Sequence, residues 1–132
     1  MLQGLGELGL QTVIVSNTSF MDADAYPADF GALGWSEWVT GYVTSVEVGR
    51  HKPDPAIFLH ALAVARCVAD ETVMIGNSES ADIFGAKALG IRTVRVAIEE
   101  PVPDHSGADA VVSSLADALV AVEAWISGPP VP

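Results

Sequence analysis

Two short apolar runs, each ending abruptly in polar residues, constrain the fold of this chain most strongly. Residues 12–15 (TVIV) lead into residues 16–19 (SNTS), and residues 72–75 (TVMI) lead into residues 76–78 (GNS). Short, β-branched, nearly all-apolar segments are typical of parallel strands covered on both faces. The runs therefore predict an α/β fold with a buried parallel sheet. In such sheets, ligands bind beyond the carboxyl ends of the strands.

Further strands and helices are expected to alternate with these two runs. Strands are predicted at residues 92–96 and 109–112, with a weaker one at 42–44. Helices are predicted from Pro55 to Ala65 after an Asp54 N-cap, from Ser78 or Ser80 to Gly90, and from Ser114 to about Trp125. Residues 2–10 are interpreted as the end of a helix that leads into the first strand. This alternation indicates βαβ units.

The length of 132 residues favours one domain with a substantial core, since half of the residues are hydrophobic. At this size, roughly two-thirds of the unfolded surface can be buried. We expect residues 1–126 to form the α/β core and residues 127–132 to form a flexible, Pro-rich tail.

Charge and cysteine content exclude several classes of partner and site. Six Lys and Arg stand against seventeen Asp and Glu, a formal net charge of −11. This excess argues against nucleic acid or a membrane as partner, although one pocket lysine can still bind a small anion. One cysteine, Cys67, permits neither a disulfide framework nor a Cys-based zinc site. No secretory leader or apolar run of ~18 residues is apparent, so a soluble cytoplasmic protein is expected.

Ser16, Asn17 and Lys52 are candidates for binding an anion. Ser16 follows a predicted buried strand, where its hydroxyl and the next backbone amides can hold a phosphate oxygen. The alternative is that the hydroxyl caps the following helix. Lys52 lies in the segment HKPDP, beside a helix start and stiffened by two prolines. Such a lysine can clamp an anion, although loop lysines are usually solvated surface charges.

Asn77 and Asp82 are candidates for binding a metal ion. Both follow the strand at residues 72–75, and both offer the oxygen ligands that Mg²⁺ prefers. The alternative is that Asp82 lies in a first helical turn and interacts with the helix dipole.

Together, the segments VIVSN, KPDPAIF and MIGNSESADIFGAKALGI resemble, in this order, the haloacid dehalogenase-like (HAD) hydrolases. The resemblance covers residues 5–125. It implies a Rossmann-like, three-layer parallel sheet and Mg²⁺-assisted hydrolysis of a small phosphorylated substrate. It also implies catalytic roles for Ser16, which binds the phosphoryl group together with Asn17, and for Lys52, which balances its charge. Asn77 and Asp82 would hold the magnesium.

The chain departs from the family pattern in two places. Asn77 stands where the family usually has an Asp, so magnesium binding is expected to be weakened. The Asp-x-Asp segment that supplies the family's nucleophile is absent, as is the mobile cap. Asp22-Ala23-Asp24 has the right letters but follows the strand end, where first-turn acidic residues are the ordinary interpretation. The chain is therefore interpreted as the C-terminal part of a core, and its independent enzymatic activity is left open.

The absent segment would form the central strand of the family's sheet. Without it, the flanking strands could pair directly, a partner chain could supply the strand, or two copies could pair across exposed edges. A homo-oligomer or a partner chain that completes the sheet is expected. Two alternatives to a phosphohydrolase part are a non-catalytic remnant serving as a binding or assembly subunit, and an incomplete version of a longer protein.

Overall fold

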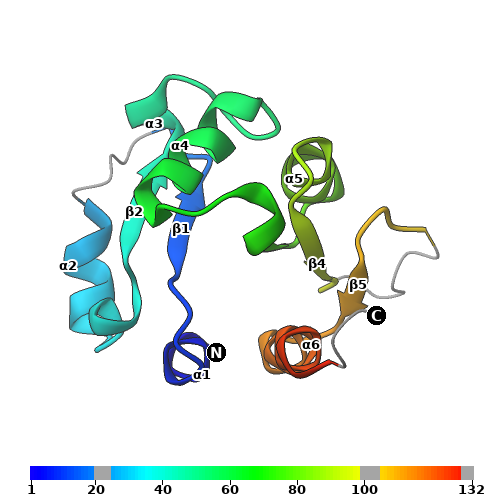
Figure 1. Cartoon of the computed structure of the whole chain (residues 1–132). Helices are drawn as coiled ribbons and strands as arrows, with labels where there is room; N and C mark the ends of the chain where they lie inside the picture. Colours follow the sequence, from blue (N-terminus) through cyan, green and yellow to red (C-terminus); the bar gives the residue numbers. More distant parts are fainter. Residues whose placement is uncertain (20–24, 99–104, 129–132) are drawn as a thin grey trace.

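The computed structural model describes residues 1–19, 25–98 and 105–128 (Figure 1). Short helices and strands alternate along the chain, as the sequence predicts. In chain order they are α1 (Leu2–Glu7), β1 (Val13–Ser16), α2 (Ala25–Ala32), η1 (Ser36–Trp38), β2 (Gly41–Thr44), α3 (Ser45–Val48), α4 (Pro55–Ala65), η2 (Ala69–Glu71), β3 (Val73–Gly76), η3 (Glu79–Ile83), α5 (Phe84–Ala88), β4 (Arg92–Val96), β5 (Ala110–Val112) and α6 (Leu115–Ser127).

All strand pairs in the described part of the chain are parallel, which confirms the predicted α/β class. β1 pairs with β2, aligning Val13 with Gly41. β3, β4 and β5 form a second sheet in that order. The predicted strands are found within about one residue of their expected ends. The described strands form two separate sheets, consistent with a parallel sheet whose central strand is absent.

β1 has one edge that faces away from its neighbour β2. The carbonyl of Thr12 accepts a hydrogen bond from the amide of Thr40 at 2.7 Å, so Thr12 faces β2. Backbone groups alternate in direction along a strand, and the N–H and C=O groups of Val13 and Val15 therefore face away from β2. We call this row the inner edge of β1.

β3 has a corresponding edge that faces away from β4. The carbonyl of Thr72 accepts from the amide of Arg92 at 3.3 Å, so Val73 and Ile75 direct their backbone groups to the opposite side. We call this row the inner edge of β3. In the described residues, β1 and β3 do not pair with each other, so direct closure of the flanking strands is not the arrangement found.

Helix contacts hold the two sheets in one molecule (Figure 1). α4 packs on β1 and β2 and also contacts α5, where Gly85 leaves room for the ring of Phe58. At the other end of the molecule, α1 meets α6, with Gly4 against Leu119. A side chain at either glycine would collide with its neighbour. The glycines therefore permit the close contacts that join the two halves.

Two hydrophobic clusters fill the interior. The first lies between α4, α5 and the sheets, and the second lies between β4 and α6. Their buried members are Val43, Ile57, Phe58, Ala86 and Ile91 in the first cluster, and Val94, Val96 and Ala118 in the second.

Helix starts follow the capping residues that the sequence predicts. Asp54 accepts from the amide of Ala56 at 2.9 Å, Ser78 from Ala81 at 3.1 Å, and Ser114 from Asp117 at 3.1 Å. Ser78, rather than Ser80, is thus the cap of the η3–α5 segment. α6 extends to Ser127, slightly beyond the predicted end at Trp125. Within the described ranges, no helix is both long and apolar enough to cross a membrane.

Candidate phosphate-binding site

Ser16 is the last residue of β1, and its hydroxyl is hydrogen-bonded to a tyrosine. The Tyr26 hydroxyl, from the start of α2, donates to Ser16 Oγ at 2.8 Å. The Ser16 side chain is partly buried. The structure thus gives this hydroxyl a side-chain partner that the sequence did not predict.

The loop after β1 is fastened by Ser45. The Ser45 hydroxyl accepts from the amide of Thr18 at 2.8 Å and donates to the carbonyl of Thr18, also at 2.8 Å. Ser45 is 2% exposed. This two-way contact fixes the path of the backbone immediately after Ser16 and Asn17.

Asn17 holds the backbone of Lys52. Its Oδ1 accepts from the Lys52 amide at 2.7 Å, and its Nδ2 donates to the Lys52 carbonyl at 3.0 Å. Both ends of the Asn17 side-chain amide are therefore engaged with one residue of the chain. Asn17 places Lys52 next to the end of β1, and the peptide bond that follows, Lys52–Pro53, is cis.

The Lys52 ammonium group reaches across to the second sheet. Its Nζ donates to the Val15 carbonyl, on the inner edge of β1, at 3.0 Å. It also lies 2.6 Å from Asp82 Oδ1, and the two side chains are 10% and 5% exposed. Lys52 is therefore a largely buried cation between the two inner edges, at their carboxyl ends. The surface-charge alternative does not apply to this side chain.

Asp82 is brought to Lys52 by an unusual turn. Residues Glu79–Ile83 form a π-helix, in which the amide of Ile83 bonds the carbonyl of Ser78 at 3.1 Å. The Ser78 amide donates to Asp82 Oδ2 at 3.0 Å, so the carboxylate folds back over the end of β3. It packs where a Cβ at Gly76 would otherwise lie. Short π-helical turns are frequent at functional sites.

Asn77 directly follows the end of β3, at the surface beside this cluster. Its side chain is exposed, and its carbonyl accepts from Arg95 Nε at 3.3 Å. Of the residues predicted for the site, the structure brings Ser16, Asn17, Lys52 and Asp82 together. It leaves Asn77 at the surface beside them.

Glu79 and Asp109 fasten the segment of residues 105–109 beside the site. Glu79 accepts from Ser106 Oγ and from the Gly107 amide, each at 2.6 Å, and pairs with Arg95 at 3.3 Å. The Ser106 hydrogen bond, helped by the Gly107 amide and Arg95, lowers the pKa of Glu79 against an opposing effect of burial. The hydrogen bond from Lys87 similarly lowers the pKa of Asp109, which also accepts from Thr93.

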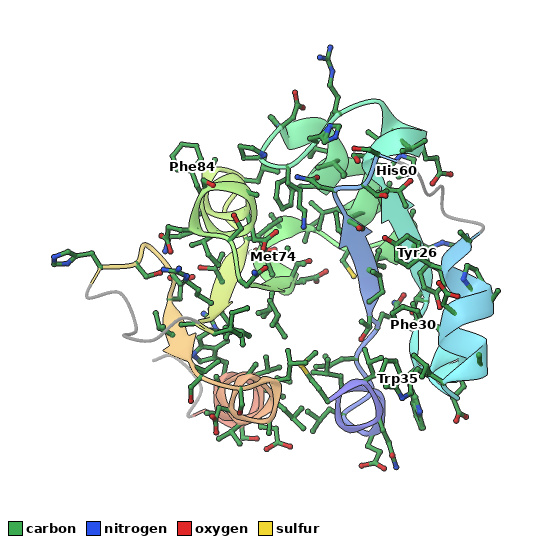
Figure 2. The ribbon with its side chains drawn as sticks, turned by 180° about the vertical axis from the view of Figure 1, so that it is seen from behind. Tyr26, Phe30, Trp35, His60, Met74 and Phe84 are labelled. Atoms are coloured by element: carbon green, nitrogen blue, oxygen red, sulfur yellow. The ribbon has the colours of Figure 1, made fainter. Side chains whose placement is uncertain are left out.

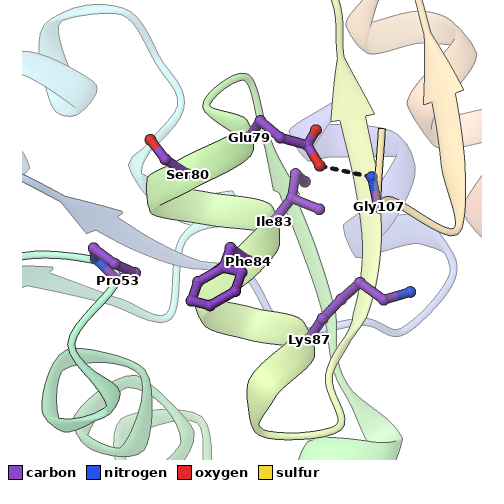
Figure 3. Close-up of a pocket in the computed structure, with 7 residues that line it drawn as sticks. All are labelled: Pro53, Glu79, Ser80, Ile83, Phe84, Lys87 and Gly107. Carbon is purple, nitrogen blue, oxygen red and sulfur yellow. Dashed lines mark hydrogen bonds between the residues drawn. The ribbon is translucent and has the colours of Figure 1, made fainter. Parts of the chain in front are cut away.

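Figure 3 shows a pocket beside this segment, with the Glu79–Gly107 hydrogen bond on its rim. The pocket has a volume of about 770 Å³ and lies along the outer side of η3 and α5. Its lining residues are Pro53, Glu79, Ser80, Ile83, Phe84, Lys87 and Gly107. Ser16, Lys52 and Asp82 do not line it, so this pocket is distinct from their cluster.

The side chains that the structure describes do not by themselves form a magnesium site. Asp82 is the carboxylate at the cluster, and its two oxygens are bonded to Lys52 and to the Ser78 amide. The described residues contain no group of three or more His, Cys, Asp or Glu placed to hold a metal ion. Mg²⁺ bound here would need to displace Lys52 or gain a carboxylate from elsewhere. Asp22-Ala23-Asp24 lies outside the described residues.

Several residues of the site were missed by sequence reasoning. Tyr26 and Ser45 carry no local signal, since their contacts are made through tertiary structure. Arg95 did carry one, because it interrupts the apolar strand RTVRV. It is 6% exposed, and an arginine in a buried strand needs partners such as Glu79 and the Asn77 carbonyl.

Comparisons with known proteins agree on one family. The family model for the haloacid dehalogenase-like hydrolases matches residues 1–96. A ribulose-1,5-bisphosphate 5-phosphatase of Halopiger xanaduensis is 37% identical over 90 residues, which cover 68% of this chain and 38% of that protein. Haloacid dehalogenase-like hydrolase domain-containing protein 3 of Mus musculus is 32% identical over 126 residues, 92% of this chain and 49% of that protein.

Solved structures show the same fold. The crystal structure of a HAD phosphatase from Thermococcus onnurineus superposes with a TM-score of 0.77 at 24% identity, covering 98% of this chain and 56% of that one. The chain thus spans less than half the length of the two relatives named above, and little more than half of this structure.

Proposed function

The chain belongs to the haloacid dehalogenase-like hydrolase family, and we propose that it is the phosphate-binding part of a phosphohydrolase core. The observation that carries this proposal is the position of Lys52 Nζ, 3.0 Å from the Val15 carbonyl and 2.6 Å from Asp82. A largely buried ammonium group at the carboxyl ends of parallel strands suits a phosphate ester. The relatives named as phosphatases support the same class of reaction.

Each residue of the cluster has a distinct role in this proposal. The Ser16 hydroxyl and the amides that follow β1 donate hydrogen bonds to phosphate oxygens. The Lys52 ammonium group balances the charge of the ester and of the group that attacks it. Asn17 and Asp82 position Lys52, one through its backbone and the other through its side chain.

The nucleophile comes from a further strand in this proposal. Neither inner edge pairs with another described strand, so a parallel strand could join β1 on one side and β3 on the other. An aspartate at the carboxyl end of that strand would lie beside Ser16 and Lys52. Its carboxylate would attack phosphorus to form a phosphoaspartate while the bond from phosphorus to the alcohol oxygen breaks and the second Asp of an Asp-x-Asp segment protonates that oxygen. Water would then attack the phosphoaspartate, which releases phosphate and restores the carboxylate. The strand belongs either to a part of the protein outside residues 1–132 or to a partner chain.

Magnesium binding depends on the same strand. Asp82 and Asn77 together offer one negative charge, and a second carboxylate would give Mg²⁺ the oxygen ligands it requires. We therefore propose that these 132 residues alone bind Mg²⁺ weakly.

A second function, as a non-catalytic binding or assembly subunit, is favoured by a different observation. Asn77 is exposed and uncharged, and the Asp82 carboxylate is already paired with Lys52. In this case a strand, or a second copy of the chain, would pair with the inner edges without supplying chemistry.

Addition of a strand-forming peptide separates the two functions. The full chain is mixed with a strand-forming peptide that is rich in β-branched residues and ends in Asp-x-Asp. In a separate sample it is mixed with a control peptide in which the first Asp is replaced by Asn. Hydrolysis of p-nitrophenyl phosphate with Mg²⁺ is measured, together with hydrogen exchange at Val15 and Ile75. We expect hydrolysis when the chain is mixed with the Asp-x-Asp peptide and none with the Asn control peptide. Hydrolysis should also be lost when the Lys52→Met variant is mixed with the Asp-x-Asp peptide. Protection of both amides without turnover would support the non-catalytic function. Absence of protection would contradict the added strand.

A further inference from the structure

We propose that Tyr26 is a positioning residue of the phosphate site, acting through the hydroxyl of Ser16. This inference rests on the proposed function, because it assigns Ser16 a phosphate oxygen as its second partner. The relevant contact is the 2.8 Å hydrogen bond from the Tyr26 hydroxyl to Ser16 Oγ.

The direction of this hydrogen bond leaves Ser16 ready to donate. A serine hydroxyl has one hydrogen and two lone pairs. Because Tyr26 donates to one lone pair, the Ser16 hydrogen stays available for an acceptor. An ionised phosphate oxygen is such an acceptor. Tyr26 therefore does not compete with phosphate, and a donor behind the Ser16 oxygen strengthens the bond that Ser16 donates.

The Tyr26 ring is held in place by an aromatic cluster that includes a residue of β2. It stacks on Tyr42, with ring centroids 6.0 Å apart and planes 17° from parallel. Phe30 packs edge-on against Tyr42 at 5.4 Å and against Trp35 at 5.8 Å. Figure 2 shows Tyr26 and Phe30 on α2 and Trp35 close by.

This cluster fixes the position of Tyr26 relative to β1, the strand that ends at Ser16. Tyr42 lies in β2, where it is aligned with Ile14 of β1. The Tyr26 hydroxyl is thus fixed relative to Ser16 from two directions, through the ring stack and through its own hydrogen bond. Aromatic pairs of this kind restrict ring motion at little entropic cost.

Tyr42 provides a matched control in the same ring stack. Within the described residues, its hydroxyl is buried and has no hydrogen-bond partner. Tyr42→Phe and Tyr26→Phe each remove one hydroxyl and keep the ring. The two variants differ in that Tyr26→Phe alone removes a donor to Ser16.

The test is a phosphate titration of the full chain, followed by the amide NMR shifts of residues 16–18. Wild type is compared with Tyr26→Phe, Tyr42→Phe, Ser16→Ala and the double variant Tyr26→Phe/Ser16→Ala. We expect Tyr26→Phe to weaken phosphate binding by about five- to tenfold, the effect of one hydrogen bond. Tyr42→Phe should leave the affinity at the wild-type value. In the Ser16→Ala background, Tyr26→Phe should have no further effect.

The double variant distinguishes positioning from a general structural effect. A structural role of Tyr26 would weaken binding equally with or without the Ser16 hydroxyl, and such additivity would overturn the inference. Wild-type affinity in Tyr26→Phe would overturn it as well. If wild-type chain binds no phosphate, the proposed function fails and the inference fails with it. That result is distinct from phosphate binding that is indifferent to Tyr26.

Discussion

Lys52 and Asp82 form an ion pair that joins two halves of the molecule. Their atoms Nζ and Oδ1 are 2.6 Å apart, and the residues are 30 positions apart in the chain. Lys52 immediately precedes the loop to α4, which packs on β1 and β2, whereas Asp82 lies in η3, which packs on β3 and β4. Both side chains are nearly buried. Removing either charged group would leave the other buried without its partner.

Lys52→Met is expected to destabilise the protein by about 3–5 kcal/mol, the typical cost of leaving one partner of a buried pair unpaired. Urea denaturation measures this change. The double variant Lys52→Met/Asp82→Asn should regain part of the lost unfolding free energy, because it no longer contains an unpaired buried carboxylate. The control is Lys87→Met, from the exposed Lys87–Asp109 pair, which should cost only about 0–1 kcal/mol. Equal losses in Lys52→Met and Lys87→Met would contradict the buried pairing.

Gly76→Ala is expected to disturb Asp82 directly. A Cβ at position 76 would overlap with the Asp82 carboxylate, which has to move away from Lys52. We expect a loss of about 1–3 kcal/mol in unfolding free energy, as for other overpacked sites. Gly31→Ala in α2 is the control. Its Cβ would meet only Ser36 Oγ at 4.0 Å, and it should be neutral or stabilising by up to about 1 kcal/mol. A neutral Gly76→Ala would show that Asp82 does not lie over Gly76.

Asn77→Asp is expected to raise the affinity for Mg²⁺ by about tenfold or more, since it adds a second carboxylate next to Asp82. Isothermal titration with MgCl₂ measures the change. Because Asn77 is exposed, the fold should be unaffected, as circular dichroism would confirm. Asn77→Gln keeps the side-chain amide and should leave the affinity low. Unchanged affinity in Asn77→Asp would show that position 77 is too far from Asp82 to share an ion.

The Glu79 network is expected to weaken in acid. The hydrogen bonds from Ser106 and Gly107 and the charge of Arg95 hold the pKa of Glu79 below its ordinary value of 4.5. A lowered folded-state pKa contributes stability that is present above pH 4.5 and is lost as pH falls through the folded value. The amide shift of Gly107, followed from pH 7 to pH 3 by NMR, should report this release.

Glu79→Gln tests the same network at neutral pH. It should shift the Gly107 amide at pH 7 and flatten its acid titration, whereas Glu123→Gln on the exposed face of α6 should do neither. A Gly107 titration that survives in Glu79→Gln would assign the acid response to another carboxylate.

The strands and caps of this fold could be read from the sequence because their signals are local. The β-branched run that becomes β1, and Asp54 followed by Pro55, each determine structure within a few residues. Asp22 and Asp24 indicate a helix start, but the extent of α2 is not predicted, because residues 25–32 contain Pro27 and Gly31 and show no helical periodicity of apolar residues. The helix is kept by the contacts of Tyr26 and Phe30 with Tyr42.

Most residues of the candidate site could be predicted from the sequence, but the hydrogen bonds between them could not. Ser16, Asn17, Lys52 and Asp82 follow from their places after strands or in the KPDP segment. Two features depend on contacts between distant residues, and one segment cannot reveal such contacts. These are the hydrogen bonds between Asn17 and the Lys52 backbone, 35 positions away, and the pairing of Asp82 with Lys52, 30 positions away.

The hydrogen bonds between Asn17 and the backbone of Lys52 fix the position of Lys52 independently of its side chain. Both hydrogen bonds go to backbone atoms, so they persist whatever side chain stands at position 52. The loop will therefore present a substitute, such as ornithine or a thioether analogue of lysine, from the same starting point. The length and basicity of this one group can then be varied independently, so position 52 is a place where the charge beside Ser16 and Asp82 can be changed without moving the backbone.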